Sequence, residues 1–123
     1  MNKWVLLKHT VFSDNSFDIH YDFLVEDKID CLTWKFLKLP SSNEASVEII
    51  KQQNHRLIWL LRKEHELSEN RGLVKRIDHG VFKNISDEFK TEHFRYILDG
   101  EILSGLLEIS NNICRLSEIN IHL

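Results

Sequence analysis

The chain has 123 residues and a mass of 14.6 kDa, which suffices for one domain over residues 1–123 and leaves too little sequence for a second hydrophobic core. Hydrophobic residues make up 42% and charged residues 28% of the sequence, a globular composition that excludes the disordered and fibrous classes. With 16 basic against 19 acidic residues the formal net charge is -3, so any binding to nucleic acid requires a local basic patch.

The amino-terminal segment contains a short apolar run, Trp-Val-Leu-Leu at residues 4–7, which Lys8 and His9 close. This run is too short for the core of a signal peptide or for a membrane span. We therefore expect a cytoplasmic protein without a membrane partner. The two cysteines, Cys31 and Cys114, lie in strand-like segments without a Cys-x-x-Cys spacing, which predicts two buried free thiols.

Alternation with a period of two is clearest over residues 17–25, Phe-Asp-Ile-His-Tyr-Asp-Phe-Leu-Val. It predicts a β-strand whose odd-numbered, apolar residues share one face. Successive side chains of a strand point to opposite sides. Asp18, His20, Asp22 and Leu24 are therefore expected to share the other face.

Strand-like segments dominate the rest of the chain. In chain order, the predicted strands cover residues 3–9, 17–25, 29–37, 56–62, 73–77, 81–85, 93–98, 101–109 and 113–121. Three short connections favour antiparallel pairing: a loop at residues 78–80 (Asp-His-Gly), a two-residue turn at 99–100 (Asp-Gly) and another turn at 111–112 (Asn-Asn). Neighbouring strands are therefore expected to pair as a meander.

Two segments favour helices. Ser41 and Glu44 have the spacing of a capping box, which predicts a helix over residues 43–53, although Val47 and Ile49 also fit a strand. A second short turn of helix is expected to begin at Ser86, where acidic residues follow. About nine short strands have too many edges to remain open, so the predicted fold is mainly β, a small closed or partly open antiparallel β-barrel with one or two short helices.

His20 and Asp22 are the strongest candidates for chemistry. In a strand, their i, i+2 spacing places an imidazole and a carboxylate side by side, and such a pair can hold a divalent metal. His9 would be a third ligand if the first two strands are neighbours, and this donor set suits Mn, Fe or Zn. The alternative is a polar face that is merely solvated. The histidines expected to be solvated are His65, His79, His93 and His122.

His55 follows a polar stretch at residues 52–54 and precedes an apolar run at residues 57–61. It is either an ordinary loop histidine or a group that donates a proton or a hydrogen bond to a phosphoryl oxygen. Arg56 and Arg71 could add positive charge beside a phosphate. The basic residues that could form a compensating patch are Lys35, Lys38, Arg56, Arg71, Lys75 and Arg76.

Several blocks of the sequence match a known family in the same order. They are Lys8-His9, His20-Tyr21-Asp22-Phe23-Leu24-Val25-Glu26, Leu32-Thr33-Trp34, His55-Arg56-Leu57, and the segments at residues 70–82 and 98–105. The His-Tyr-Asp-Phe strand followed by the Thr-Trp strand is the most specific element. In these blocks, which cover most of the chain, the sequence resembles the phosphoesterase domain at the amino terminus of bacterial DNA ligase D and its small stand-alone relatives.

This resemblance implies a small β-barrel with a metal site in a crescent-shaped groove. It implies removal of 3′-phosphates and terminal ribonucleotides from the 3′ ends of DNA, with manganese as the preferred metal. Zinc is the alternative, because it suits the same donors. It makes His9, His20 and Asp22 the metal ligands. It makes His55 the histidine that contacts the scissile phosphate, where it would stabilise charge or supply a proton to the leaving oxygen.

Three positions depart from the family pattern. Leu24 stands where ligase-associated members carry an arginine, Trp59 replaces a tyrosine, and Lys38 corresponds to a substrate-contacting lysine without its usual neighbours. Arg56, Arg71, Lys38 and Trp59 are the candidates for binding the phosphate or the rest of the substrate. The expected function is a metal-dependent phosphoesterase acting on DNA 3′ ends or on a small phosphorylated substrate. The alternative is a catalytically weakened or inactive barrel that binds a phosphate, a nucleotide or a protein partner.

Overall fold

The structure is a computed structural model that describes residues 2–67 and 72–119. Within them it is mainly β, with nine strands and one short 3-10 helix, η1. The elements are β1 (Lys3–Ser13), β2 (Ser16–Glu26), β3 (Cys31–Phe36), β4 (Val47–Lys51), η1 (Leu57–Leu60), β5 (Glu64–Leu67), β6 (Gly72–Asn84), β7 (His93–Asp99), β8 (Ser104–Ser110) and β9 (Ile113–Ser117). No helix in this part of the chain has the length and hydrophobicity needed to cross a membrane.

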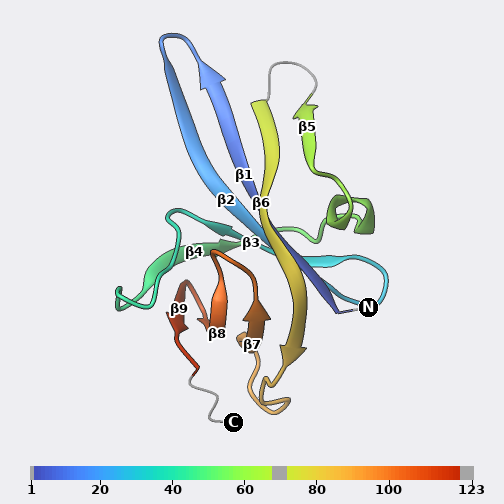
Figure 1. The fold of residues 1–123 in the computed structure, drawn as a ribbon, viewed down its shortest axis with the longest axis vertical. Coiled ribbons are helices and arrows are strands. Elements are labelled where there is room, and N and C mark those ends of the chain that lie inside the picture. The colour runs from blue at the N-terminus through green and yellow to red at the C-terminus, as the bar shows by residue number, and fades with distance from the viewer. Residues whose placement is uncertain (1, 68–71, 120–123) are drawn as a thin grey trace.

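The strands form one antiparallel sheet that closes on itself (Figure 1). Their order is β1-β2-β3-β4-β9-β8-β7-β6-β5, and β1 also pairs with β6. Eight strands therefore form a ring, and β5 extends the sheet beyond it by pairing with β6. The predicted closed, mainly β, antiparallel fold is confirmed. The meander holds within β1–β4 and within β5–β9, and the β4–β9 and β1–β6 pairings join these two runs.

β1 and β2 form a long hairpin whose far end projects from the rest of the molecule (Figure 1). They pair from Trp4 with Val25 to Ser13 with Ser16. On its other edge β1 pairs with β6 from Lys3 to Thr10. His9 therefore lies in a stretch of β1 that has a partner strand on both sides, which fixes its position firmly.

The larger hydrophobic core lies inside the ring. Trp4, Phe23, Trp34, Phe36 and Tyr96 are at most 1% exposed. Their rings meet in tilted, stacked and edge-on pairs, geometries that stabilise aromatic contacts beyond the burial of area. The apolar face predicted for residues 17–25 is confirmed in part: Phe23 and Val25 are buried in this core and Tyr21 packs against it. Phe17 and Ile19, in the projecting part of the hairpin, are exposed.

A second, smaller core lies on the opposite, outer face of the sheet. Its buried residues come from β1, β2, β3, η1 and β6: Val5, Leu7, Leu24, Cys31, Leu60 and Val74. Trp59 packs against them and remains partly exposed. We call these residues the outer core. Because η1 covers this part of the outer face, Leu24 is 0% exposed although it shares a strand face with polar residues.

The helix predicted over residues 43–53 is wrong, because β4 occupies Val47–Lys51. Val47 and Ile49 are buried in the ring core, and β4 pairs with β3 on one side and β9 on the other. A strand at this place is needed to close the ring. Tertiary pairing therefore overrides the local capping signal at Ser41.

The turn of helix predicted at Ser86 is also wrong, since residues 85–92 form irregular turns. The Asp87 carboxylate accepts a hydrogen bond from the Phe89 N–H (2.9 Å). A short acidic side chain that binds its own backbone in this way competes with helix formation.

The strand predicted over residues 56–62 is replaced by η1, which directs Leu60 into the outer core. A short apolar run without alternation fits a buried helical turn as well as a strand. The charged run that follows contributes β5, and its His65, predicted to be solvated, is half-buried.

The loop predicted at residues 78–80 is absent, because β6 runs through it and pairs with β1 there. The two-residue turn predicted at residues 99–100 is a longer loop, since Asp99 pairs with Ser104. Asp78 explains the longer loop: its carboxylate accepts hydrogen bonds from backbone N–H groups of residues 101–103. The turn at residues 111–112 is confirmed.

Both cysteines are free and buried, as predicted. Burial raises the pKa of Cys31 to about 12 and that of Cys114 to about 12, so the reactive thiolate is scarce near neutral pH. We expect iodoacetamide at about pH 8 to leave the folded protein unlabelled and to label both cysteines in urea, as measured by intact mass. Equal labelling rates in the folded and unfolded protein would contradict this prediction.

Candidate metal centre

Two neighbouring strands position the candidate metal ligands. His20 and Asp22 lie on β2, and His9 lies on β1 directly opposite His20. Directly paired residues of antiparallel strands share a face. All three side chains therefore project from the outer face of the sheet, and we call them the triad.

The side chains of the triad converge. His9 Nδ1 lies 3.2 Å from His20 Nε2 and 3.9 Å from Asp22 Oδ2, and His20 Nε2 lies 3.4 Å from Asp22 Oδ1. The side chains of both histidines are 18% exposed and that of Asp22 is 12% exposed. The triad is thus shielded by its neighbours and still open to a small ligand from solvent.

These separations fit a bound metal ion. An ion about 2.1 Å from its ligands keeps neighbouring ligand atoms about 3.0 Å apart in an octahedron and about 3.4 Å apart in a tetrahedron. One donor atom from each of the three residues lies within 4.8 Å of the others. Two imidazoles and one carboxylate suit Mn, Fe or Zn, and three protein ligands leave positions for water and substrate.

Buried apolar side chains and the short helix η1 border the triad. Leu7 and Leu24 are 2% and 0% exposed, and both lie next to Asp22 on the outer face. Leu60 packs on them, so η1 lies over the outer face of β1 and β2 beside the triad. Leu24, at the position where the resemblance leads to an arginine, is buried in the outer core, where an unpaired charge would be costly to desolvate.

His55 lies two residues before η1, and its backbone is held in place. Its backbone forms an isolated bridge with Cys31 (N···O 2.8 and 3.0 Å), whose side chain belongs to the outer core. The Nδ1–H of His55 donates a hydrogen bond to the Gln53 carbonyl (3.0 Å). A carbonyl can only accept, so Nε2 is the nitrogen that can exchange a proton.

The strand register places His55 on the same outer face of the sheet as the triad, but apart from the converging side chains of His9, His20 and Asp22. Lys35 is the residue of β3 opposite Asp22, and Cys31 lies four residues before it, which is about 13 Å along a strand. His55 pairs with Cys31 on the edge of β3 away from β2. The role predicted for His55 therefore stays a prediction.

The other predicted substrate-binding residues lie in three different settings. Lys38 forms an ion pair with Glu44 (2.9 Å), and Arg56 is exposed at the residue before η1. Trp59 lies in η1 and packs on the outer core. Arg71 lies outside the described residues.

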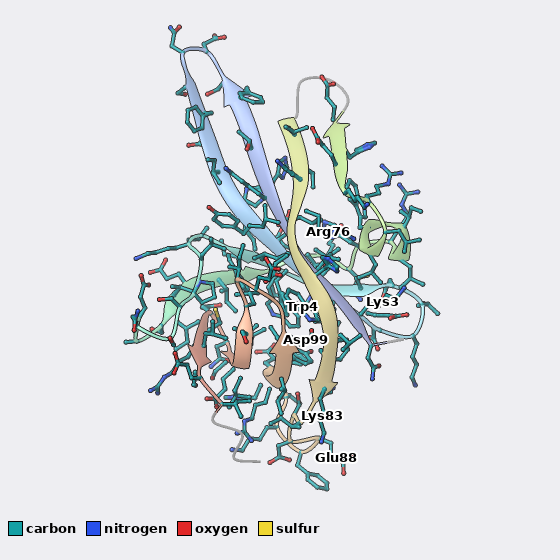
Figure 2. The ribbon with its side chains drawn as sticks, viewed as in Figure 1. Lys3, Trp4, Arg76, Lys83, Glu88 and Asp99 are labelled. Atoms are coloured by element: carbon teal, nitrogen blue, oxygen red, sulfur yellow. The ribbon has the colours of Figure 1, made fainter. Side chains whose placement is uncertain are left out.

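Lys35 and Arg76 lie in the row of cross-strand neighbours that contains Asp22. Lys35 pairs with Asp22, and Arg76 pairs with Leu7, which in turn pairs with Asp22. Figure 2 shows Arg76 beside β6 on the side of η1. Neither cation is in an ion pair with a described residue. Lys75, by contrast, is one residue from Arg76 on β6 and projects from the opposite face.

Sequence analysis missed two polar side chains beside the triad, His65 and Arg62. Both are half-buried, and an Arg62 guanidinium N–H donates to His65 Nδ1 (2.7 Å). The sequence Glu64-His65-Glu66 does alternate, and in a strand it would direct the histidine away from the two glutamates. That short alternation is the signal that could have identified His65.

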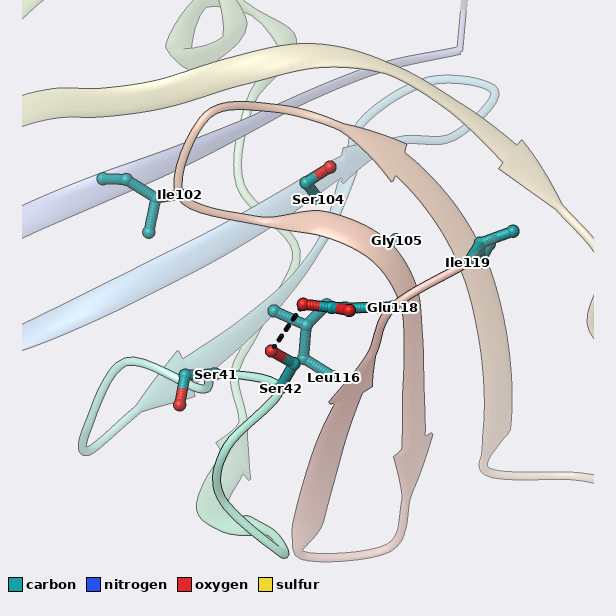
Figure 3. Close-up of a pocket in the computed structure, with 8 residues that line it drawn as sticks. All are labelled: Ser41, Ser42, Ile102, Ser104, Gly105, Leu116, Glu118 and Ile119. Carbon is teal, nitrogen blue, oxygen red and sulfur yellow. Dashed lines mark hydrogen bonds between the residues drawn. The ribbon is translucent and has the colours of Figure 1, made fainter. Parts of the chain in front are cut away.

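A separate pocket of about 400 Å³ lies where residues 41–42 approach β8 and the end of β9 (Figure 3). Ser42 Oγ donates a hydrogen bond to Glu118 Oε1 (3.3 Å) there. Small and apolar side chains such as Ser104 and Leu116 complete the lining. The described residues that line this pocket supply one carboxylate, Glu118, and no histidine or cation, so fewer metal donors meet here than at the triad.

Comparison with known proteins leaves the triad as the main guide to function. No family model matches the chain, and no curated protein matches it. The function must therefore be argued from the triad and the charges around it.

Proposed function

We propose that the protein is a metal-dependent phosphoesterase that acts on 3′-phosphate or 3′-ribonucleotide ends of DNA, with manganese as its metal. The convergence of His9, His20 and Asp22 carries this proposal. Zinc would fit the same donors. A cytoplasmic location belongs to the same proposal and is in keeping with two free, buried thiols.

The charges around the triad suit an anionic substrate. Asp22 contributes one negative charge, which a divalent ion would more than neutralise. Lys35 lies on one side of it and Arg76 on the other, both on the outer face. Asp18, two residues from His20 on the same face, places negative charge toward the tip of the hairpin. A phosphate would therefore be drawn to the side of the triad nearer the ring.

The residues around the triad have separate roles in this proposal. When bound, the metal would supply polarisation of a phosphoryl oxygen, and the triad would hold it with open positions toward solvent. Lys35 and Arg76 would neutralise charge on the other phosphoryl oxygens. The role predicted for His55 is part of this proposal: Nδ1 is committed to Gln53, so Nε2 would be the hydrogen-bond donor or proton source for the leaving oxygen. The side chains of His55 and the triad, with the phosphate between them, would have to span the roughly 13 Å that separates their positions along the sheet.

The test follows phosphate release from a DNA oligonucleotide that carries a 3′-phosphate. We expect release with Mn²⁺, none with EDTA, and a fall in kcat of at least about 100-fold in the His55→Ala variant. The melting temperature of this variant should still rise with Mn²⁺, because His55 lies outside the converging ligands. His93→Ala, which removes an exposed histidine of β7, is the matched control and should keep full activity.

Absence of release while Mn²⁺ is bound would contradict the proposed function. Equal kcat values for the wild-type protein and His55→Ala would remove His55 from the mechanism and leave the metal site in place.

A second candidate function is a binding module that uses the same metal site without turnover. The buried Leu24 and the distance of His55 from the triad along the sheet favour it. Such a module would hold a phosphate or a nucleotide, or dock a protein partner. Binding of a 3′-phosphorylated oligonucleotide that needs Mn²⁺ but gives no product would identify this function, whereas turnover that depends on His55 would exclude it.

A further inference from the structure

Three side chains form a compact cluster between η1 and β5. The guanidinium carbon of Arg62 lies 4.9 Å from the centre of the Trp59 ring. The His65 ring meets the same indole edge-on, with 5.4 Å between centroids. An Arg62 N–H donates to His65 Nδ1 (2.7 Å), which leaves the proton of the neutral imidazole on Nε2. Both polar groups are thus held in place before any ligand binds.

The strand register places this cluster beside the triad. His20 pairs with His9, His9 with Val74, and Val74 with His65. These four residues form one row across β2, β1, β6 and β5, and they share the outer face. His65 is two strands from His9, which is about 10 Å. Val74 between them belongs to the outer core, so the buried apolar surface continues from the triad to the cluster.

The positive charge of Arg62 has no carboxylate partner among the described residues. Both of its neighbours, Trp59 and His65, are neutral as hydrogen-bonded here. Glu64 and Glu66 flank His65 on β5 but alternate with it, so they project from the opposite face of the sheet. A half-buried, oriented and uncompensated guanidinium is a suitable donor for an anionic oxygen of a ligand.

We propose that Arg62 and His65 bind the phosphodiester next to the terminal phosphate of a single-stranded DNA 3′ end, while Trp59 positions Arg62. This inference rests on the proposed function, since the triad would hold the terminal phosphate. The roughly 10 Å between the His9 and His65 strands is wider than one phosphate group. A substrate that reaches both sites therefore carries a second anionic group, as a nucleic acid strand does and a simple phosphomonoester does not.

The experiment compares two substrates and two readouts. Binding of a 5′-fluorescein-labelled, single-stranded DNA with a 3′-phosphate is followed by anisotropy as the salt concentration is raised. We expect Arg62→Gln to weaken binding by about tenfold or more and to lower the slope of log K against log salt by about 1. The KM for para-nitrophenyl phosphate and the rise of the melting temperature with Mn²⁺ should not change.

Further variants separate positioning from charge. Trp59→Ala should weaken DNA binding as Arg62→Gln does, although it removes no charge, and Trp59→Phe should restore binding because it keeps a ring under the guanidinium. His65→Gln should weaken DNA binding less than Arg62→Gln, because a neutral donor is lost instead of a charged one. Arg115→Gln, which removes an exposed arginine of β9, is the matched control and should bind as the wild-type protein does.

The outcomes distinguish this inference from the proposed function. Wild-type affinity and salt slope in Arg62→Gln would overturn the inference, even if the protein hydrolyses the substrate. Absence of any DNA binding by the wild-type protein would overturn it as well. Binding that depends on Arg62 without phosphate release would support the DNA-binding cluster and contradict the hydrolytic function.

Discussion

We expect saturating Mn²⁺ to raise the melting temperature of the wild-type protein and to leave that of the His20→Ala variant unchanged. A ligand that binds only the folded state stabilises it by about 2.7 kcal/mol at about 100 times its Kd, a rise of about 10 °C for a domain of this size. His20 Nε2 is the atom close to both other donors, at 3.2 Å and 3.4 Å. Its loss leaves one imidazole and one carboxylate, too few ligands to retain the ion.

Without metal, the same variant should fold with a loss of about 1 kcal/mol or less, because one partly exposed hydrogen bond to His9 is removed. His93→Ala is the matched control: His93 also lies on a strand and pairs with a neighbour, Ser110 Oγ (3.1 Å). Its melting temperature should rise with Mn²⁺ as the wild-type value does. If His20→Ala responds to Mn²⁺ as strongly as the wild-type protein, the ion is bound elsewhere and the triad is not the metal site.

The triad could be predicted from the sequence because it depends on local geometry. The alternation over residues 17–25 fixes the faces of β2, and it places His20 beside Asp22 whatever the rest of the chain does. Adding His9 needs only one further condition, that β1 pairs with β2. A hairpin between consecutive strands is the simplest way to meet that condition, and the structure has it.

The position of the Trp59, Arg62 and His65 cluster beside the triad could not be predicted from the sequence, because it depends on pairings between distant segments. His65 reaches the row of His9 only because β6 pairs with β1 on one edge and with β5 on the other. The β1–β6 pairing spans some seventy residues of sequence and includes a register shift between Leu6 and Leu7. No local pattern encodes such a shift.

The errors in secondary structure have the same origin. Ser41 and Glu44 have the spacing of a helix cap, yet Val47 and Ile49 are buried in the ring core and β4 is the strand that closes the ring. The gain from burial and pairing exceeds a capping preference of about 1 kcal/mol. In the same way, η1 replaces a strand because the outer core needs Leu60.

We expect Asp78→Ala to lower the free energy of unfolding by about 3 to 5 kcal/mol. The Asp78 carboxylate is 5% exposed and accepts four backbone hydrogen bonds. Oδ1 accepts from the N–H groups of His79 and Glu101, both at 3.0 Å, and Oδ2 accepts from Ile102 (2.8 Å) and Leu103 (2.7 Å). Alanine would leave these donors without their partner in a largely buried setting.

The size of this effect follows from the packing of the loop that Asp78 anchors. Residues 100–103 connect β7 to β8, and Leu103 is 0% exposed in the ring core. Gly100 leaves no room for a Cβ, because Asp78 and the Trp4 ring contact that position. When the carboxylate is lost, the loop loses its anchor and Leu103 loses part of its packing. Asp78 thus links β6 to the β7–β8 connection and has a structural role.

Urea unfolding followed by circular dichroism measures the loss, with Asp87→Ala as the matched control. Asp87 also accepts a backbone N–H, from Phe89 at 2.9 Å, but it is exposed, so its replacement should lower stability by about 1 kcal/mol or less. Asp78→Asn keeps the shape and one acceptor oxygen, and it should fall between the two alanine variants. Because Asp78 lies outside the triad, folded Asp78→Ala should still be stabilised by Mn²⁺. A stability for Asp78→Ala equal to that of Asp87→Ala would show that solvent replaces the four hydrogen bonds. The loop would then be held by the packing of Leu103 and by the hydrogen bond from the Gly100 N–H to the Leu103 carbonyl (2.9 Å).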